Sequence, residues 1–270
     1  MNLLNIYNYP MPKVNIIIPL YNEEKILKKN IINLQKKFSK FLNKSSWQFI
    51  LVDNGSTDDT TKIIKSLLST NIKGQLIFES EPNYGKAIRR GLLFSDSDYV
   101  FLCDIEQWDF PFFLWAWINR EEYDYFIGSR RSDLTINKSP FIRKLLSWGL
   151  NTFINLLFSY MGTDTHGPKF MNLKKIKKVI RQVKSDRGQF DTELVLRLSR
   201  YGYKIAEAPI FHKEYRVNKF SIFKKIGWNI FALSKMYNVL KNVKYKKNPI
   251  FNQFSRSDVI NRYRIRKYKS

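Results

Sequence analysis

The sequence predicts an α/β fold in which a mostly parallel β-sheet is flanked by helices. Short β-rich runs alternate with helical segments through the first hundred residues, which is typical of parallel sheets. The first run, residues 14–18, is largely apolar, as expected for a strand buried on both faces. Polar clusters follow three of the runs, and the carboxyl ends of parallel strands are where such sheets bind ligands.

The remaining elements follow from the spacing of the apolar residues. Residues 23–42 are expected to form a helix, because Ile26, Leu27, Ile31, Leu34 and Phe38 recur at helical spacing. Further strands are expected at residues 49–52, 75–78 and 99–102, and further helices at residues 58–68 and 84–94. In the second half, residues 142–160 and 223–240 are expected to be helical.

The chain divides into residues 1–240, expected to form one domain with acceptor-facing or membrane-facing helices, and a basic tail at residues 241–270. The tail carries ten lysines and arginines but a single acid, Asp258. No internal repeat separates further units.

Composition limits the class of protein. The apolar fraction of 44% indicates a packed core, and the single cysteine, Cys103, excludes a disulfide framework or a zinc cluster of thiolates. No signal peptide or membrane span is expected, so we expect a cytoplasmic protein. Its best apolar stretch, residues 145–161, is interrupted by polar side chains.

The formal net charge is +24, which attracts anionic surfaces such as nucleic acid or acidic lipid headgroups. The alternative is a bias of composition that leaves the lysines simply solvated. There is no zinc-finger spacing or RNA-binding signature, so no specific nucleic acid partner is expected.

Two polar clusters follow the first two strands. In the first, Pro19 ends the strand, Tyr21 offers a ring for stacking on a base, and Glu23 places a carboxylate in the sheet mouth. In the second, Asp53 at the strand end is suited to accept a hydrogen bond from a base, and Gly55 permits a tight turn. Each cluster alone is also compatible with an ordinary strand exit that opens a helix.

Asp104 and Glu106, one residue apart after the fourth strand, form the third cluster. Two such carboxylates are suited to a hard divalent cation, Mg²⁺ or Mn²⁺, that bridges a diphosphate. The structural alternative is an acidic strand end that caps a helix beginning near Pro111.

A basic constellation comes later in the chain. Arg130 closes a strand, and Arg143 and Ser147 lie four residues apart, hence on one face of the expected helix. Arginine binds phosphate oxygens with a planar fork, although an ordinary pair of surface arginines is the alternative.

These clusters, together with the Asn83-Tyr84-Gly85-Lys86-Ala87 segment, resemble glycosyltransferase family 2, and within it the dolichol- and polyprenyl-phosphate sugar synthases. The resemblance runs from residue 14 to about residue 210 and implies the GT-A fold. It implies that Pro19, Tyr21, Glu23 and Asp53 hold the donor nucleotide, a UDP- or GDP-sugar.

The same resemblance places Lys86 and Arg89 near the donor. It assigns Arg130, Arg143 and Ser147 to the phosphate of a lipid acceptor. Asp104 and Glu106 match the metal-binding acidic motif, although the family usually has aspartate where this chain has Glu106.

Two later segments extend the resemblance. Residues 164–170 resemble the Asp-Thr-x-x-Gly-Phe-Lys segment of the family, with Pro168 in place of phenylalanine and with His166 as a substitution that is expected to be structural or acceptor-lining. Asp191 falls in a Phe-Asp-x-Glu motif and is placed near the sugar and acceptor, a role compatible with capping a helix. Arg216 and Ser221 match a further family segment loosely.

The expected function is inverting transfer of a sugar to a polyprenyl (dolichyl or undecaprenyl) phosphate, with Asp104, Glu106 and Asp191 as catalytic residues. The protein is expected to lie on the cytoplasmic face of an anionic membrane, with the aromatic residues 110–117 at headgroup depth. One alternative is a soluble hydroxyl acceptor, for which Asp191 or Glu193 would act as the base. The other is a catalytically impaired basic module that binds membrane or nucleic acid.

Overall fold

The computed structural model describes residues 12–43, 45–133, 149, 152–211, 233–243 and 250–267. The described strands form one sheet in the order β3-β2-β1-β4-β6-β5-β7-β8. Their bounds are β1 Val14–Leu20, β2 Trp47–Asn54, β3 Gly74–Glu79, β4 Tyr99–Leu102, β5 Tyr125–Ser129, β6 Lys169–Asn172, β7 Ile205–Pro209 and β8 Phe251–Gln253.

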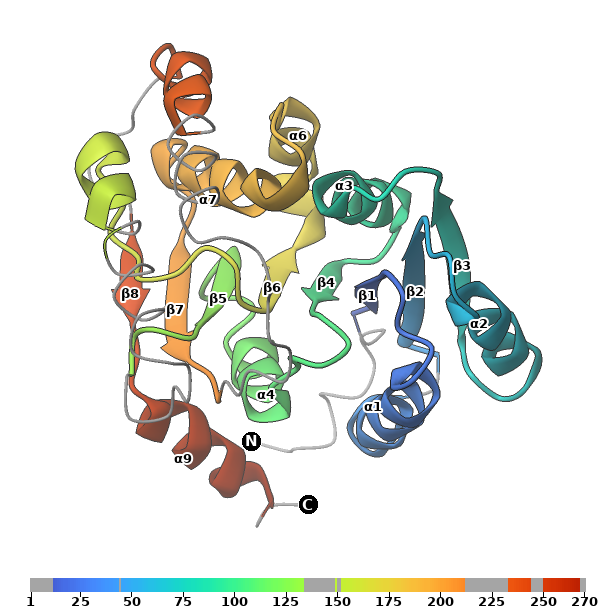
Figure 1. The fold of residues 1–270 in the computed structure, drawn as a ribbon. Helices are drawn as coiled ribbons and strands as arrows, with labels where there is room; N and C mark the ends of the chain where they lie inside the picture. Colours follow the sequence, from blue (N-terminus) through green and yellow to red (C-terminus); the bar gives the residue numbers. More distant parts are fainter. Residues whose placement is uncertain are drawn as a thin grey trace.

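Helices cover both faces of this sheet (Figure 1). One layer contains α1, α2 and α4, with α9 packed on α4, and the other contains α3, α6 and α7. Their bounds are α1 Leu27–Phe41, α2 Thr60–Ser69, α3 Tyr84–Phe94, α4 Phe110–Ile118, α6 Leu173–Gln182, α7 Phe190–Arg200 and α9 Arg256–Lys267. The 3₁₀ turn η2, Arg187–Gln189, precedes α7, and residues 152–158 and 233–240 are also helical.

Alternation along the strands builds the two cores. In β1, Ile16 and Ile18 pack toward α1 and α4, whereas Ile17 packs toward α3. All seven residues of β1 are buried, which explains why this strand is apolar without a polar face.

The α/β sheet and its flanking helices confirm the predicted fold class. Helix α3 and strand β4 have the predicted bounds, while β1 runs through Pro19 to Leu20. Helix α1 begins later than predicted, at Leu27, because Glu23 closes a turn in which its carbonyl accepts the N–H groups of Ile26 and Leu27.

The stretch expected to be a basic tail contributes two elements to the fold. Strand β8 pairs with β7 in parallel, and α9 packs against α4. The Arg256 guanidinium anchors the start of α9, since it lies 2.8 Å from the Asp109 carboxylate and donates to the Pro209 carbonyl.

The expectation that residues 110–117 lie at membrane headgroup depth is wrong. They form most of α4, which is apolar all round, and Phe112 through Trp117 are buried. Phe113 packs edge-on against Phe38 of α1, with ring centroids 4.8 Å apart. These aromatic side chains therefore stabilise the core and are not available to a bilayer.

Strand β6 runs against the direction of its two neighbours in the sheet. It runs antiparallel between β4 and β5, so its first residue, Lys169, lies at the edge where β4 and β5 end. Lys169 stands opposite Leu102 of β4 and Ile127 of β5. Side chains from the ends of these strands and from the segment before β6 therefore meet at one place.

Candidate functional site

Charged side chains converge at this edge of the sheet. Asp104 lies two residues beyond Leu102, and Arg130 follows the last residue of β5. Lys169 enters from β6, and Asp191 comes from the first turn of α7. The structure thus brings together Asp104, Arg130 and Asp191, three of the residues predicted from the sequence.

Lys169 is the central cation of this cluster. Its ammonium lies 2.9 Å from Asp191 Oδ2 and donates to the Gly167 carbonyl at 2.8 Å. Both side chains of this ion pair are almost completely buried, with 2% and 1% exposed. The Asp191 oxygens accept no aligned hydrogen bond among the described residues, so the pairing is one of charge.

Asp104 is oriented by Tyr84, whose hydroxyl donates to Asp104 Oδ1 at 3.0 Å. Tyr84 begins α3 and is partly buried; desolvation of its phenol, followed by the negative charge of Asp104, raises the pKa of that phenol well above the usual value. Burial also raises the pKa of Asp104, and this outweighs the opposing effects of Lys169 and of the Tyr84 hydrogen bond. Its surroundings therefore compensate the negative charge of the Asp104 carboxylate only in part.

Glu106 points to the neighbouring part of the site. It lines a cavity of about 520 Å³ with side chains from the loop after β1 and from the turn before α2. The cavity is lined by Asn22, Glu23, Glu24, Lys25, Ile26, Asp58 and Glu106. The structure thus places Glu23 and Glu106 together in a hollow at the carboxyl ends of the strands.

The two loops that wall this cavity interlock. Asn22 has a left-handed backbone, φ 54°, and its side-chain oxygen accepts the Thr57 N–H at 2.8 Å. The Glu23 N–H in turn donates to Thr60 Oγ1 at 2.7 Å. Asparagine tolerates this conformation better than most residues, which accounts for its position here.

The other predicted donor residues lie around these loops. Asp53 is buried at the end of β2, where its oxygens accept the Ser56 N–H and the Thr61 hydroxyl. Tyr21 is exposed, and Pro19 lies within β1.

The two basic residues of α3 have different surroundings. Lys86 is half-exposed and pairs with Glu81 at 3.4 Å. Arg89 donates to the carbonyls of Val183 and Ser185, so it holds the segment between α6 and α7.

Arg130 is held by Asp164. Its Nε and Nη2 donate to the two Asp164 oxygens at 2.8 and 3.0 Å, a bidentate pair in which Asp164 is fully buried. Arg130 holds the pKa of Asp164 well below its usual range despite burial, and Asp164 raises the pKa of Arg130. Arg143 and Ser147, predicted to act with Arg130, lie outside the described residues, as do Arg216 and Ser221.

The His166 ring bridges two segments of the chain. Its Nε2 lies 2.8 Å from the Gly188 carbonyl, which requires a proton on that nitrogen, and Nδ1 lies 2.8 Å from Thr165 Oγ1. Thr165 Oγ1 also meets Thr192 Oγ1 at 2.9 Å. Burial lowers the pKa of His166, so the ring is neutral and ties the segment before β6 to the start of α7.

The Glu193 carboxylate accepts hydrogen bonds from the backbone. It is fully buried, accepts the N–H groups of Lys184 and Ser185, and pairs with Arg197 at 2.7 Å. Burial raises the pKa of Glu193, but these hydrogen bonds outweigh it and hold that pKa below its ordinary value. Glu193 is thus engaged by backbone donors and by Arg197, whereas Asp191 is held by its pairing with Lys169.

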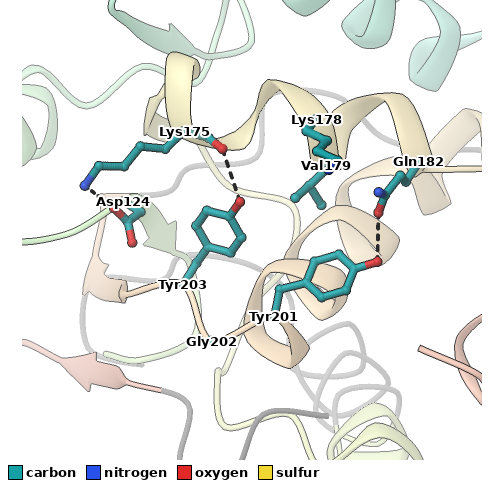
Figure 2. A pocket seen from close by; sticks show the side chains of 8 residues that line it. All are labelled: Asp124, Lys175, Lys178, Val179, Gln182, Tyr201, Gly202 and Tyr203. Atoms are coloured by element: carbon teal, nitrogen blue, oxygen red, sulfur yellow. Dashed lines mark hydrogen bonds and ion pairs between the residues drawn. The ribbon is translucent and has the colours of Figure 1, made fainter. Parts of the chain in front are cut away.

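A second cavity, about 560 Å³, lies at the opposite edge of the sheet, where β5 and β7 begin (Figure 2). Its polar groups are largely paired with one another. Lys175 lies 2.6 Å from Asp124, and the Tyr201 hydroxyl donates to Gln182 at 2.7 Å. None of the residues predicted from the sequence lines it, so the charged edge is the better candidate site.

Residues without a predicted role complete the candidate site. Sequence reasoning did not assign Tyr84, Lys169, Asp164 or Glu207, although all four fall in segments that resemble the family. The sequence offered one signal for two of them, since Asp164 and Lys169 are charged residues close together in residues 164–169. Placing them at the site requires the antiparallel direction of β6, which the spacing of apolar residues does not reveal.

Comparisons with known proteins agree with this picture. Residues 15–180 match the family model described as glycosyl transferase family 2. The chain is 28% identical to a dolichyl-phosphate beta-glucosyltransferase of Dictyostelium discoideum, over 73% of this chain and 65% of that protein. It is 27% identical to the UDP-N-acetylglucosamine–dolichyl-phosphate N-acetylglucosaminyltransferase of Methanococcus voltae, over 84% of this chain and 98% of that protein.

Among solved structures, the fold is similar to that of the mannosyltransferase PcManGT from Pyrobaculum calidifontis in complex with GDP-Man and Mn²⁺. The TM-score is 0.61 at 15% identity, and the match covers 90% of this chain and 68% of that one.

Proposed function

Because the chain belongs to glycosyl transferase family 2, we propose that it moves a sugar from a nucleoside-diphosphate sugar to a polyprenyl phosphate, with inversion at the anomeric carbon. It is a nucleotide-sugar glycosyltransferase, so the alternative of a non-catalytic basic module falls away. The lipid acceptor, its phosphate ligands and the donor residues are the proposed part.

One observation carries the proposal. Arg130, with its guanidinium fixed by Asp164, lies at the same sheet edge as Asp104 and Asp191. A cationic group for an acceptor phosphate and carboxylates for the donor side thus share one site. Arg143 and Ser147, on one face of the predicted helix, are proposed to complete the phosphate contacts.

The reaction needs little proton chemistry from the protein. A phosphate-ester oxygen is already anionic near pH 7, so it attacks the anomeric carbon directly while the bond to the nucleoside diphosphate breaks. Asp191 is proposed to orient the sugar and acceptor. Its buried pairing with Lys169 suits a carboxylate that is held in one position. For a hydroxyl acceptor the same carboxylate would be the base.

The chain is proposed to use a divalent cation held by Asp104 and Glu106. Within the described residues, no group of three or more histidine, cysteine or acidic side chains is placed to hold a metal by itself. Two carboxylates fit a cation such as Mg²⁺ or Mn²⁺, which commonly takes its remaining ligands from substrate phosphates and waters. Such a cation would neutralise charge on the departing diphosphate.

A membrane surface is the proposed location of the reaction. The helix at residues 152–158 exposes Phe153 and Leu156, the latter with 80% of its surface accessible, and the chain carries a net charge of +24. Among the described residues, no helix is long and apolar enough to cross a bilayer.

The test is a transfer assay with a panel of UDP- and GDP-sugars, with and without Mg²⁺ or Mn²⁺. Three acceptors are compared: a polyprenyl phosphate, the matching polyprenol and a water-soluble oligosaccharide. We expect turnover with the polyprenyl phosphate alone, and a loss of at least about a hundredfold in Arg130→Ala, since a buried charged contact is removed. Equal turnover with the polyprenol or the oligosaccharide would refute the proposed acceptor.

A further inference from the structure

Behind Arg130 lies a second buried carboxylate, Glu207 of β7. Glu207 is fully buried and stands opposite Ile127 of β5 and Gln253 of β8 in the sheet. Its side chain points to the turn at residues 163–164, which precedes β6. Glu207 and Gln253 both lie outside residues 15–180, which match the family model.

The Glu207 carboxylate accepts hydrogen bonds from the N–H groups of that turn. Both oxygens lie 3.0 Å from the Thr163 N–H, and Oε1 also accepts the Asp164 N–H and the Thr163 hydroxyl, each at 3.0 Å. Gln253 Nε2 donates to Oε2 at 3.1 Å and to the Met161 carbonyl at 3.2 Å. Four donor groups therefore fix one carboxylate, and that carboxylate fixes the turn.

The turn at residues 163–164 then fixes the position of Arg130. Once its backbone N–H is held by Glu207, Asp164 directs its side chain to Arg130 Nε and Nη2. The Tyr160 hydroxyl adds a hydrogen bond to the Asp164 carbonyl at 3.0 Å, and the Tyr160 ring packs edge-on against Phe251 of β8. A chain of buried contacts thus leads from the C-terminal strand to the arginine.

Close backbone packing leaves the turn little freedom to adopt another position. A Cβ added to Gly167 would lie 1.7 Å from the Gly128 carbonyl oxygen, and one added to Gly162 would lie 2.7 Å from the Phe251 ring. The segment is therefore seated directly against β5 on one side and against β8 on the other.

We propose that Glu207 is a positioning residue for the acceptor side: supported by Gln253, it holds the 163–164 turn so that Asp164 presents the Arg130 guanidinium in one orientation. The consequence for catalysis rests on the proposed function, in which Arg130 binds the acceptor phosphate. The structural part of the proposal, that the orientation of Arg130 depends on Glu207, does not depend on the proposed function.

The first measurement is independent of activity. The ¹⁵N–¹H signal of Arg130 Nε, identified by its absence in Arg130→Lys, should be protected from solvent exchange in the unaltered protein. In Glu207→Met, which keeps the length but accepts no hydrogen bond, we expect at least tenfold faster exchange, because the turn loses its acceptors. Glu193→Gln is the matched control: it alters another fully buried glutamate that also accepts backbone N–H groups, and should leave the Arg130 signal in place.

The second measurement is kinetic. Glu207→Met should raise the KM for polyprenyl phosphate on the order of tenfold and leave the KM for the donor unchanged. Adding Glu207→Met to Arg130→Ala should raise the acceptor KM no further, because the effect passes through Arg130. Glu207→Gln should restore part of the loss. If Glu207→Met does not fold, Gln253→Leu serves in its place. It alters an exposed strand and removes only the donor that supports Glu207, so we expect a smaller rise in the acceptor KM.

The outcomes are distinguishable. Faster exchange at Arg130, without transfer to polyprenyl phosphate by any variant, would support the positioning role and refute the proposed acceptor. Unchanged exchange in both Glu207→Met and Gln253→Leu would overturn the positioning role, whatever the acceptor is. Additive effects of Glu207→Met and Arg130→Ala on the acceptor KM would also overturn it.

Discussion

Replacing Lys169 with methionine tests whether this ammonium balances the carboxylates of the site. Lys169 lies 2.9 Å from Asp191, and it is the main charge that lowers the pKa of Asp104. Only 2% of its side chain is exposed, so water does not screen the pair. Methionine keeps the approximate length and apolar character of the side chain but carries no charge.

The expected cost is large. Removing one partner of a buried ion pair leaves an uncompensated charge, which costs about 3–5 kcal/mol of a typical total stability of roughly 5–15 kcal/mol. The matched control is Lys175→Met. Lys175 lies 2.6 Å from Asp124, but 54% of its side chain is exposed, so the expected loss is about 1 kcal/mol or less. Denaturant unfolding of both variants gives the two free energies.

The pH dependence provides a second check. Without the ammonium, the folded-state pKa of Asp104 rises further above the unfolded value near 3.8. A carboxyl group whose pKa is higher in the folded than in the unfolded state does not affect stability below the unfolded-state pKa. Above it, the free energy of unfolding falls by about 1.4 kcal/mol per pH unit until the pH passes the folded-state pKa. The stability loss of Lys169→Met should therefore be smaller at pH 5 than at pH 8. Equal losses at both pH values, or a loss no greater than that of Lys175→Met, would refute the reasoning.

Four further predictions follow from the site. Asp104→Asn should reduce divalent-cation-dependent turnover at least about a hundredfold, and its circular dichroism spectrum should match that of the unaltered protein. Tyr84→Phe removes the donor to Asp104 and should raise the Mn²⁺ concentration for half-maximal activity roughly tenfold, measured by metal titration. Burial raises the pKa of Glu207 to about 7 from 4.5, so the ionisation of Glu207 alone should reduce the free energy of unfolding by roughly 3 kcal/mol between pH 4.5 and 7; Glu207→Gln should remove this contribution, measured by urea unfolding at both pH values. Leu156→Ser should weaken binding to acidic vesicles in flotation, whereas unchanged binding would exclude this helix as the contact.

The N-terminal half of the fold, from β1 to β4, could be predicted because its signals are local. Each strand and its following helix are adjacent in sequence, and Asp104 follows its strand by two residues. The first polar cluster, with Tyr21 and Glu23, could be recognised because it directly follows its strand. Its interlocking with Thr57 crosses 35 residues, however, and no spacing rule anticipates it.

The region around Arg130 could be predicted less well, because it is built from contacts between distant segments. Arg130 was expected to face a phosphate, but its pairing with Asp164, 34 residues away, depends on how the segment before β6 lies on β5. The aromatic run of α4 was misinterpreted for a related reason. A helix that is apolar all round suits either a bilayer or a core, and only the tertiary structure decides between them.

The direction of β6 is the feature on which the site depends most. Parallel strands would place the first residue of β6 at the edge where β4 and β5 begin, about 10 Å from its observed position, since four residues span three steps of roughly 3.3 Å. Lys169 would then lie away from Asp104 and Asp191, and the partly buried carboxylate of Asp104 and the buried one of Asp191 would repel each other without the ammonium. The antiparallel strand also carries the preceding segment, with Asp164, to the end of β5 beside Arg130. One reversal in a parallel sheet therefore supplies both the cation that pairs with Asp191 and the anion that orients Arg130.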